Sequence, residues 1–333
     1  MHQYGGTYND IILVENLLGA WREFLRGKKE KPDVQRFQYR LSDNLRELYF
    51  DLQHKTYYHG GYHAFKISDP KPRDIHKASV RDRLLHHALY RKLYPFFDRT
   101  FIADSYSCRI GKGTHRAMSR FRSFAAQVSR NHTRTAWVLK CDIRKFFASI
   151  DHQVLTEVLR AYIPDQDILC LLGQVIGSFS SRSNLDATGL PLGNLTSQLL
   201  VNIYMNEFDQ FVKHKLKAKY YIRYADDFVI LSHDKKALEQ TLQSVEAFLQ
   251  DRLKLRLHPD KVSITTFASG VDFLGWVHFP GHRVLRTATK KRMLRRLEER
   301  KGSDGEEAMR ESYAGLLGHG NARKLRGEII SHG

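Results

Sequence analysis

Two adjacent aspartates, Asp226 and Asp227, interrupt a stretch of residues that favour β-strands. Aromatic and β-branched residues precede them over 220–224 and follow them over 228–231. This pattern predicts two strands joined by a tight turn that carries the acids. A carboxylate beside buried apolar strands is costly unless a cation or a hydrogen-bond donor compensates it. The hairpin is therefore a candidate cation site, although Asp is also common in ordinary exposed turns.

A third carboxylate ends another strand-like run. Residues 135–142 are mostly apolar and β-favouring, and Asp142 is the last of them. Three carboxylates from two strands suit Mg²⁺, which prefers carboxylate and phosphate oxygens. Two such ions can clamp the attacking and leaving oxygens of a phosphoryl transfer.

The chain also carries a large surplus of positive charge. Its 333 residues include 54 Lys or Arg against 36 Asp or Glu, a formal net charge of +18. In a chain with 42% hydrophobic residues, this favours a folded protein with a nucleic-acid partner over a merely basic surface. No apolar run of about 18 residues predicts a membrane span, and the first residues do not resemble a signal peptide. Three scattered cysteines favour a reducing cytoplasm: Cys108, Cys141 and Cys170.

Helix-like and strand-like segments alternate, which predicts an α+β or mixed α/β core with helical additions. Helices are expected over 11–26, 33–55, 79–97, 153–161, 196–217 and 235–254. Besides the hairpin, strands are expected over 62–67, 135–142 and 273–279, and the basic segment from Arg283 onward is expected to be helical.

The joint pattern resembles the catalytic core of reverse transcriptases. Tyr224-Ala225-Asp226-Asp227 is similar to their catalytic signature, and residues 139–151 are similar to their first palm motif. Further matches in the same order are residues 70–73 and 81–89 (fingers), 189–198 (the loop before the palm helix), 258–261 and 273–276 (later palm motifs). The resemblance implies a right-hand polymerase fold with fingers, a palm built on an antiparallel sheet, and a short helical thumb.

The resemblance also implies a division of the chain. An N-terminal helical extension would span 1–34, the fingers 35–135 and the palm 136–280, with a finger insertion at about 160–200. The thumb would span 281–333.

Two departures narrow the resemblance. Leu192 stands where most bacterial reverse transcriptases carry Gln, and Gln198 stands where they carry Pro. Together with residues 15–21 and 106–115, this pair resembles the reverse transcriptases of diversity-generating retroelements. That family implies a bacterial or phage-encoded cytoplasmic enzyme that copies a template-repeat RNA into cDNA with errors mainly at adenines. The cDNA would diversify a target gene by mutagenic retrohoming. A small basic accessory variability protein, which could be a homo-oligomer, would be a partner.

Roles for single residues follow from the resemblance. Asp142, Asp226 and Asp227 would form the catalytic cluster and hold two Mg²⁺ ions, which Mn²⁺ could replace, with the Ile143 carbonyl as a further ligand. The expected nucleotide-binding residues are Lys71 and Arg73 on the dNTP phosphates, Phe147 as a steric gate against a 2′-hydroxyl, and Leu192, Gly193, Gln198 and Lys261. The expected contacts to the template RNA and the nucleic-acid primer are Arg109, Lys112, Arg283, Lys290, Lys291, Arg292, Arg295 and Arg296.

Other interpretations stay open from the sequence. The enzyme could instead be a retron, group II intron-like or phage-defence reverse transcriptase. A non-catalytic RNA-binding scaffold is an alternative of another class, against which the three intact aspartates argue. At single positions, Phe147 could be a core residue, Leu192 could merely pack under its loop, and the basic C-terminal segment could be a solvated helix face.

Overall fold

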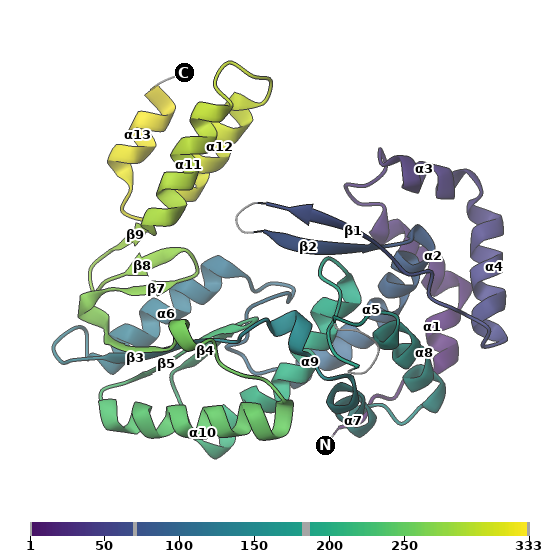
Figure 1. Ribbon diagram of the computed structural model, residues 1–333, viewed down its shortest axis with the longest axis horizontal. Coiled ribbons are helices and arrows are strands. Elements are labelled where there is room, and N and C mark those ends of the chain that lie inside the picture. Colours follow the sequence, from purple (N-terminus) through teal and green to yellow (C-terminus); the bar gives the residue numbers. More distant parts are fainter. Residues whose placement is uncertain (1, 69–71, 182–186, 332–333) are drawn as a thin grey trace.

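A four-stranded antiparallel sheet forms the centre of the computed structural model, which describes residues 2–68, 72–181 and 187–331 (Figure 1). Its strands are β3 (Trp137–Asp142), β4 (Tyr221–Tyr224), β5 (Asp227–Ser232) and β6 (Ser263–Thr266), in the order β4-β5-β3-β6. The predicted hairpin is confirmed, because β4 and β5 pair directly across the turn.

Both faces of this sheet are covered. On one face, Cys141 and Phe228 join a large core that includes α9 (Leu195–Gln210) and α10 (Lys235–Leu253). On the other, Val138 and Leu231 join a smaller core with α6 (Thr114–Val128) and β7 (Val271–Phe273). Strands buried on both sides need apolar residues at consecutive positions, and this explains the nearly continuous apolar runs in the sequence.

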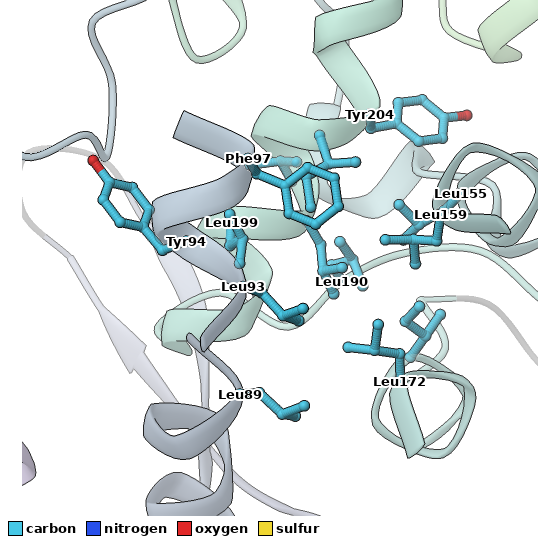
Figure 2. Close-up of a cluster of buried hydrophobic side chains, with 14 of the residues drawn as sticks. Leu89, Leu93, Tyr94, Phe97, Leu155, Leu159, Leu172, Leu190, Leu199 and Tyr204 are labelled. Atoms are coloured by element: carbon cyan, nitrogen blue, oxygen red, sulfur yellow. The ribbon is translucent and has the colours of Figure 1, made fainter. Parts of the chain in front are cut away.

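The large core extends into the N-terminal half of the chain. It takes in α1 (Tyr8–Ile12), α2 (Val14–Phe24), α3 (Pro32–Tyr39), α4 (Leu41–Gln53), α5 (Val80–Thr100), α7 (His152–Tyr162) and α8 (Gln166–Gly177). Figure 2 shows Leu93 and Phe97 of α5 among side chains of α7, α8 and α9. One core therefore crosses the boundaries expected at residues 34 and 135, and that division stays a prediction.

A two-stranded hairpin projects from this half of the molecule. It consists of β1 (Tyr62–Ile67) and β2 (Arg73–Ala78), paired from Tyr62 opposite Ala78 to Ile67 opposite Arg73. Residues 69–71 lie outside the described residues, and so does the predicted nucleotide contact Lys71.

The C-terminal helices form a separate small unit above a three-stranded sheet (Figure 1). The sheet consists of β7, β8 (Trp276–His278) and β9 (Arg283–Leu285), and the helices are α11 (Thr287–Glu299), α12 (Glu306–Leu317) and α13 (Arg323–Ser331). The helices enclose a core of their own: Met293, Leu297, Leu317, Leu325 and Ile329.

Two expectations for this region are wrong. Residues 273–279 are not one strand, because the chain reverses at Leu274 and Gly275, whose φ angles are +52° and +86°. The segment from Arg283 begins as β9, which pairs with β8, before the helices start. Apolar residues alternate in the same way in a short hairpin as in one longer strand, so the pattern over 273–279 does not distinguish the two.

Three predicted helices also differ in detail. The helix expected over 33–55 breaks at Arg40, where the Asn44 side chain donates to the Phe37 carbonyl at 2.9 Å and so satisfies the end of α3. The helix expected over 11–26 is α2 preceded by the separate α1, and the one expected over 196–217 changes from α9 to a π-helix at Phe211–Lys215.

No helix in the described ranges is long and apolar enough to cross a membrane.

Candidate active site

The three aspartates meet at one end of the β3–β5 pair. Asp142 lies directly opposite Asp227 in the antiparallel register. Tyr224 pairs with Asp227, so Ala225 and Asp226 form a two-residue turn, and Ala225 takes the left-handed conformation (φ +56°) that such turns require. The Ile143 N–H donates to the Asp226 carbonyl at 3.1 Å, which ties the turn to the end of β3.

Burial and mutual repulsion act on these carboxylates. Burial raises the pKa of Asp227 to about 7; Lys140 opposes this shift, while Asp226 and Asp142 add to it. The pKa of Asp226 is raised by burial and by Asp142. The Oδ1 atom of Asp227 is buried and has no hydrogen-bond partner among the described residues. Carboxylates held together in this way favour either a proton or a cation.

A divalent cation fits this arrangement if other groups complete its coordination. Among the described residues, no group of three or more His, Cys, Asp or Glu side chains is arranged to hold a metal ion. Mg²⁺ is commonly held by one or two carboxylates together with waters and substrate phosphates. The crowded carboxylates and the unpaired Oδ1 of Asp227 supply the protein's share of such a site.

Two lysines lie beside the acids. Lys261 Nζ is 2.6 Å from Asp142 Oδ1, and its turn is anchored by the His258 N–H, which donates to the Asp142 carbonyl at 2.7 Å. Lys140 precedes Asp142 by two residues and so projects from the same face of β3. The sequence analysis did not select Lys140, although strand alternation would have placed it there.

A cleft of about 940 Å³ opens in front of the aspartates. Its walls include Arg73 of the β1–β2 hairpin, Lys261, and Arg286 and Arg292 at and after the end of β9. Arg286 forms an ion pair with Asp272 in the wall of the cleft, and Asp272 was not expected from the sequence. The cleft thus brings acids and basic side chains from distant segments to one place.

Comparison with known proteins identifies the family. The family model described as reverse transcriptase (RNA-dependent DNA polymerase) matches residues 66–278. The chain belongs to the reverse transcriptase family. Protein YkfC of Escherichia coli K12 is 28% identical over 263 residues, which cover 67% of this chain and 66% of YkfC. The group II intron-encoded protein LtrA of Lactococcus lactis is 23% identical and covers 75% of this chain, which spans 51% of LtrA.

Solved structures agree on the fold. The telomerase of Candida albicans, solved with a fragment of telomeric RNA, matches 73% of this chain with a TM-score of 0.51 and 12% identity, over 50% of its own chain. Telomerase of Candida tropicalis matches 68% of this chain with a TM-score of 0.50 and 12% identity, over 55% of its own chain. The right-hand polymerase fold expected from the sequence is confirmed.

Not every predicted residue of this reverse transcriptase lines the cleft. Phe146 and Phe147 lie in a short 3₁₀-helix after β3, so their side chains do not point to opposite faces as neighbours in a strand would. Phe146 is buried, whereas Phe147 is half-buried and stands edge-on to it at 5.5 Å between ring centroids. Phe147 does not line the cleft, and its role as a gate stays a prediction.

The loop before α9 docks on the β1–β2 hairpin. The His76 N–H of β2 donates to the Leu192 carbonyl at 3.1 Å, and the Asn194 side chain donates to the His76 carbonyl at 2.8 Å. Leu192 is half-buried, Gly193 is exposed with φ +101°, and Gln198 lies half-buried on the first turn of α9. The loop therefore holds the strand that carries Arg73.

Two predicted nucleic-acid contacts are used inside the protein. The Arg109 side chain is only 5% exposed, and its Nε donates to Asp98 at 2.7 Å. Lys112 Nζ donates to the Ala103 carbonyl at 2.7 Å. Their donors brace the segment between α5 and α6, and their contact with nucleic acid stays a prediction. The Arg-Ile-Gly-Lys-Gly sequence gave no sign of this internal use.

The basic residues of α11 divide between the cleft and the outer surface. Arg292 faces the cleft, and Arg296 is half-buried one turn later. Lys290, Lys291 and Arg295 are exposed, and Arg295 pairs with Glu299 at 3.3 Å. Arg283 lies on β9, away from the cleft.

Proposed function

We propose that this chain is an RNA-directed DNA polymerase that joins dNTPs to a primer on an RNA template. The observation that carries the proposal is the meeting of Asp142, Asp226 and Asp227 at the end of two paired strands, facing a cleft with basic walls. Two Mg²⁺ ions, or Mn²⁺ in their place, would supply Lewis-acid activation and charge neutralisation when bound.

The protein groups would bind and orient the reactants. Asp142 and Asp226 hold the ions, the Ile143 carbonyl is a candidate further ligand, and Asp227 completes the negative cluster. The reaction is attack of the primer 3′-hydroxyl on the α-phosphate of a dNTP, with pyrophosphate as the leaving group. It needs positioning and neutralised charge more than a covalent protein group.

Basic and aromatic side chains would hold the substrates. Arg73 and Lys261 at the cleft wall would neutralise triphosphate charge, with Lys71 as a further candidate. Phe147 would exclude a 2′-hydroxyl, and Leu192, Gly193 and Gln198 would bound the base pair. Lys290, Lys291, Arg292, Arg295 and Arg296 would contact the backbone of the template–primer duplex.

Leu192 supports a narrower proposal, that the enzyme belongs to a diversity-generating retroelement. A leucine side chain cannot hydrogen-bond to the nascent base pair, so less transition-state stabilisation depends on correct pairing. The function would then be error-prone copying of a template repeat for mutagenic retrohoming, with a small basic accessory protein as a partner. The group II intron-encoded relative makes an intron-like, retron-like or phage-defence reverse transcriptase the alternative.

We also propose that the enzyme works in the cytoplasm. Cys108, Cys141 and Cys170 are all free thiols. Free thiols suit a reducing compartment.

Primer extension tests the function. The full chain is given Mg²⁺, dNTPs and an adenine-rich RNA annealed to a DNA primer, and the products are sequenced. Asp226→Ala should abolish extension, while Glu239→Gln, on the exposed side of α10, should retain it. Errors concentrated opposite adenine support the retroelement proposal, whereas faithful cDNA favours the alternative. Extension by Asp226→Ala at the wild-type rate would contradict the assigned site.

A further inference from the structure

A second cavity lies where the C-terminal helices meet the β7–β9 sheet. It has a volume of about 200 Å³, and we call it the junction cavity. Its walls come from α6, the β8–β9 turn and the loop between α12 and α13, and its polar lining residues include Arg122, His278, His282, Arg283 and His319. It shares no lining residue with the cleft in front of the aspartates.

The junction cavity carries uncompensated positive charge. None of the described residues that line it is acidic. Arg122 is exposed on α6, and among the described residues neither Arg122 nor Arg283 has a carboxylate partner. The pKa of Arg283 is lowered by burial and by the charge of Arg122. Two arginines that line the same cavity without an acidic neighbour in its described lining favour a bound anion there.

The walls of the cavity are fixed by several contacts. The Arg283 Nε donates to the His319 carbonyl, and the Asn321 N–H donates to the Arg283 carbonyl at 2.9 Å. The His319 ring lies against His115 of α6 at 3.8 Å between centroids, with the ring planes tilted by 33°. Gly320 packs so closely on Trp276 that a Cβ atom would overlap the indole ring. A ligand would therefore enter a formed site without ordering its loop first.

The size of the cavity limits the ligand. Small-molecule pockets usually measure roughly 300–1,000 Å³, and this one is smaller. A single phosphate group suits it better than a whole nucleotide. Guanidinium groups match phosphate oxygens with two parallel hydrogen bonds, and imidazole N–H groups add further donors.

We propose that the junction cavity binds one backbone phosphate of the nucleic acid, as an anchor separate from the catalytic cleft. The inference rests on the proposed function, because a polymerase holds a nucleic-acid strand beside its C-terminal helices. A free phosphate ion shares the chemistry and is the competing source of the ligand.

The test measures binding without catalysis. A labelled RNA–DNA primer–template is titrated with the full chain in the absence of dNTPs at several KCl concentrations, by fluorescence anisotropy. Loss of one phosphate contact lowers the slope of log K against log salt by about 0.7 to 0.9. We expect that reduction for Arg122→Gln and none for Arg160→Gln, a matched loss of an exposed arginine on α7. Arg122→Lys should keep most of the slope, because it keeps the charge.

The outcomes separate the two proposals. An unchanged slope for Arg122→Gln, with an unchanged melting temperature, would overturn the anchor and leave the polymerase function standing. Inorganic phosphate at constant ionic strength gives the second arm. One outcome is that phosphate stabilises the wild type but not Arg122→Gln while both proteins show the same salt slope for primer–template binding. In that case the ligand is a free phosphate ion, and binding of a backbone phosphate is overturned. A wild-type chain that binds no primer–template would overturn both proposals.

Discussion

Asp142 and Asp227 face each other as a directly opposed pair on β3 and β5. Like charges at such positions destabilise a sheet, because the two Cβ atoms lie only about 4.5–5.5 Å apart. A proton or a cation at this end of the central sheet would relieve the repulsion. The arrangement thus connects a cost in folding stability to the proposed chemistry.

Asp227→Asn should stabilise the metal-free protein while it removes polymerase activity. The buried carboxylate is held among other acids, so its replacement by a neutral amide relieves repulsion. We expect the melting temperature at pH 8 in EDTA to rise by about 1 to 2 °C, equivalent to about 1 kcal/mol for a chain of this length. Differential scanning calorimetry measures this, with Asp260→Asn as an exposed control. A lower melting temperature would contradict the argument.

Lys261→Met should strengthen metal binding in the absence of nucleotide and weaken turnover. The Lys261 ammonium group occupies Asp142 Oδ1 at 2.6 Å, where an ion would otherwise bind. The pair is partly exposed, so its loss is worth about 0.2–1 kcal/mol, which corresponds to a gain in affinity of about 1.4-fold to fivefold. Mn²⁺ titration followed by electron paramagnetic resonance checks the prediction, and Lys236→Met on α10 should change nothing. Weaker Mn²⁺ binding by Lys261→Met would contradict it.

Arg223→Met should lower the free energy of unfolding by about 3–5 kcal/mol. The Arg223 guanidinium is fully buried and binds both carboxylate oxygens of Asp209, at 2.8 and 2.7 Å. It also donates to the Ala225 carbonyl at 3.1 Å, so it supports the turn that carries Asp226. Urea unfolding measures the loss.

Two further variants check the cause of that loss. Replacing Asp209 by Leu as well should recover part of the stability, because no uncompensated charge then stays buried. Arg295→Met, at the exposed pair with Glu299, should change the free energy of unfolding by less than about 1 kcal/mol. An equal effect of Arg223→Met and Arg295→Met would contradict the role of burial.

Acid should destabilise the protein through His86. This ring is buried, neither of its nitrogens has a hydrogen-bond partner among the described residues, and burial lowers its pKa to about 3, with His59, His87 and Arg83 adding to the shift. The unfolded chain titrates near 6.5 and so binds the proton more readily. His86 therefore does not reduce the free energy of unfolding above about pH 6.5. Below that pH it lowers the free energy of unfolding by up to about 1.4 kcal/mol per pH unit towards pH 3.

His86→Leu should flatten this dependence. Urea unfolding at pH 7 and at pH 5 gives the difference, which should shrink relative to the wild type. His233→Gln, at an exposed loop position, should leave the difference as it is. A variant as acid-sensitive as the wild type would assign the effect to other groups.

Leu192→Gln should lower misincorporation opposite adenine severalfold. The glutamine would restore a hydrogen bond of about 1 kcal/mol that depends on base-pair geometry. Sequencing of cDNA from primer extension gives the error spectrum, and Leu192→Met should leave it unchanged. An identical spectrum for the glutamine variant would mean that Leu192 only packs beneath its loop.

The central strands and their acids were predictable because a covered sheet imposes a strong pattern. The apolar residues around Asp142 and Asp226 predict the strands, and the alternation of strand faces would also have placed Lys140. Short hairpins were harder to predict from the sequence. The reversal at Leu274 and Gly275 depends on their left-handed backbone conformation, which the pattern of apolar residues does not reveal. The internal use of Arg109 depends on Asp98 and on carbonyl groups of its loop, contacts that exist only after folding.

The self-contained core of α11, α12 and α13 has a mechanical consequence. Its buried residues belong to neither core of the central sheet, so a tilt of the three helices would strain their contacts with Trp276, His115 and Arg283 rather than the packing of that sheet. A polymerase must let its duplex advance by one step after each addition. A C-terminal helical unit that tilts while the carboxylates stay in place would allow this advance and keep the active site assembled between additions.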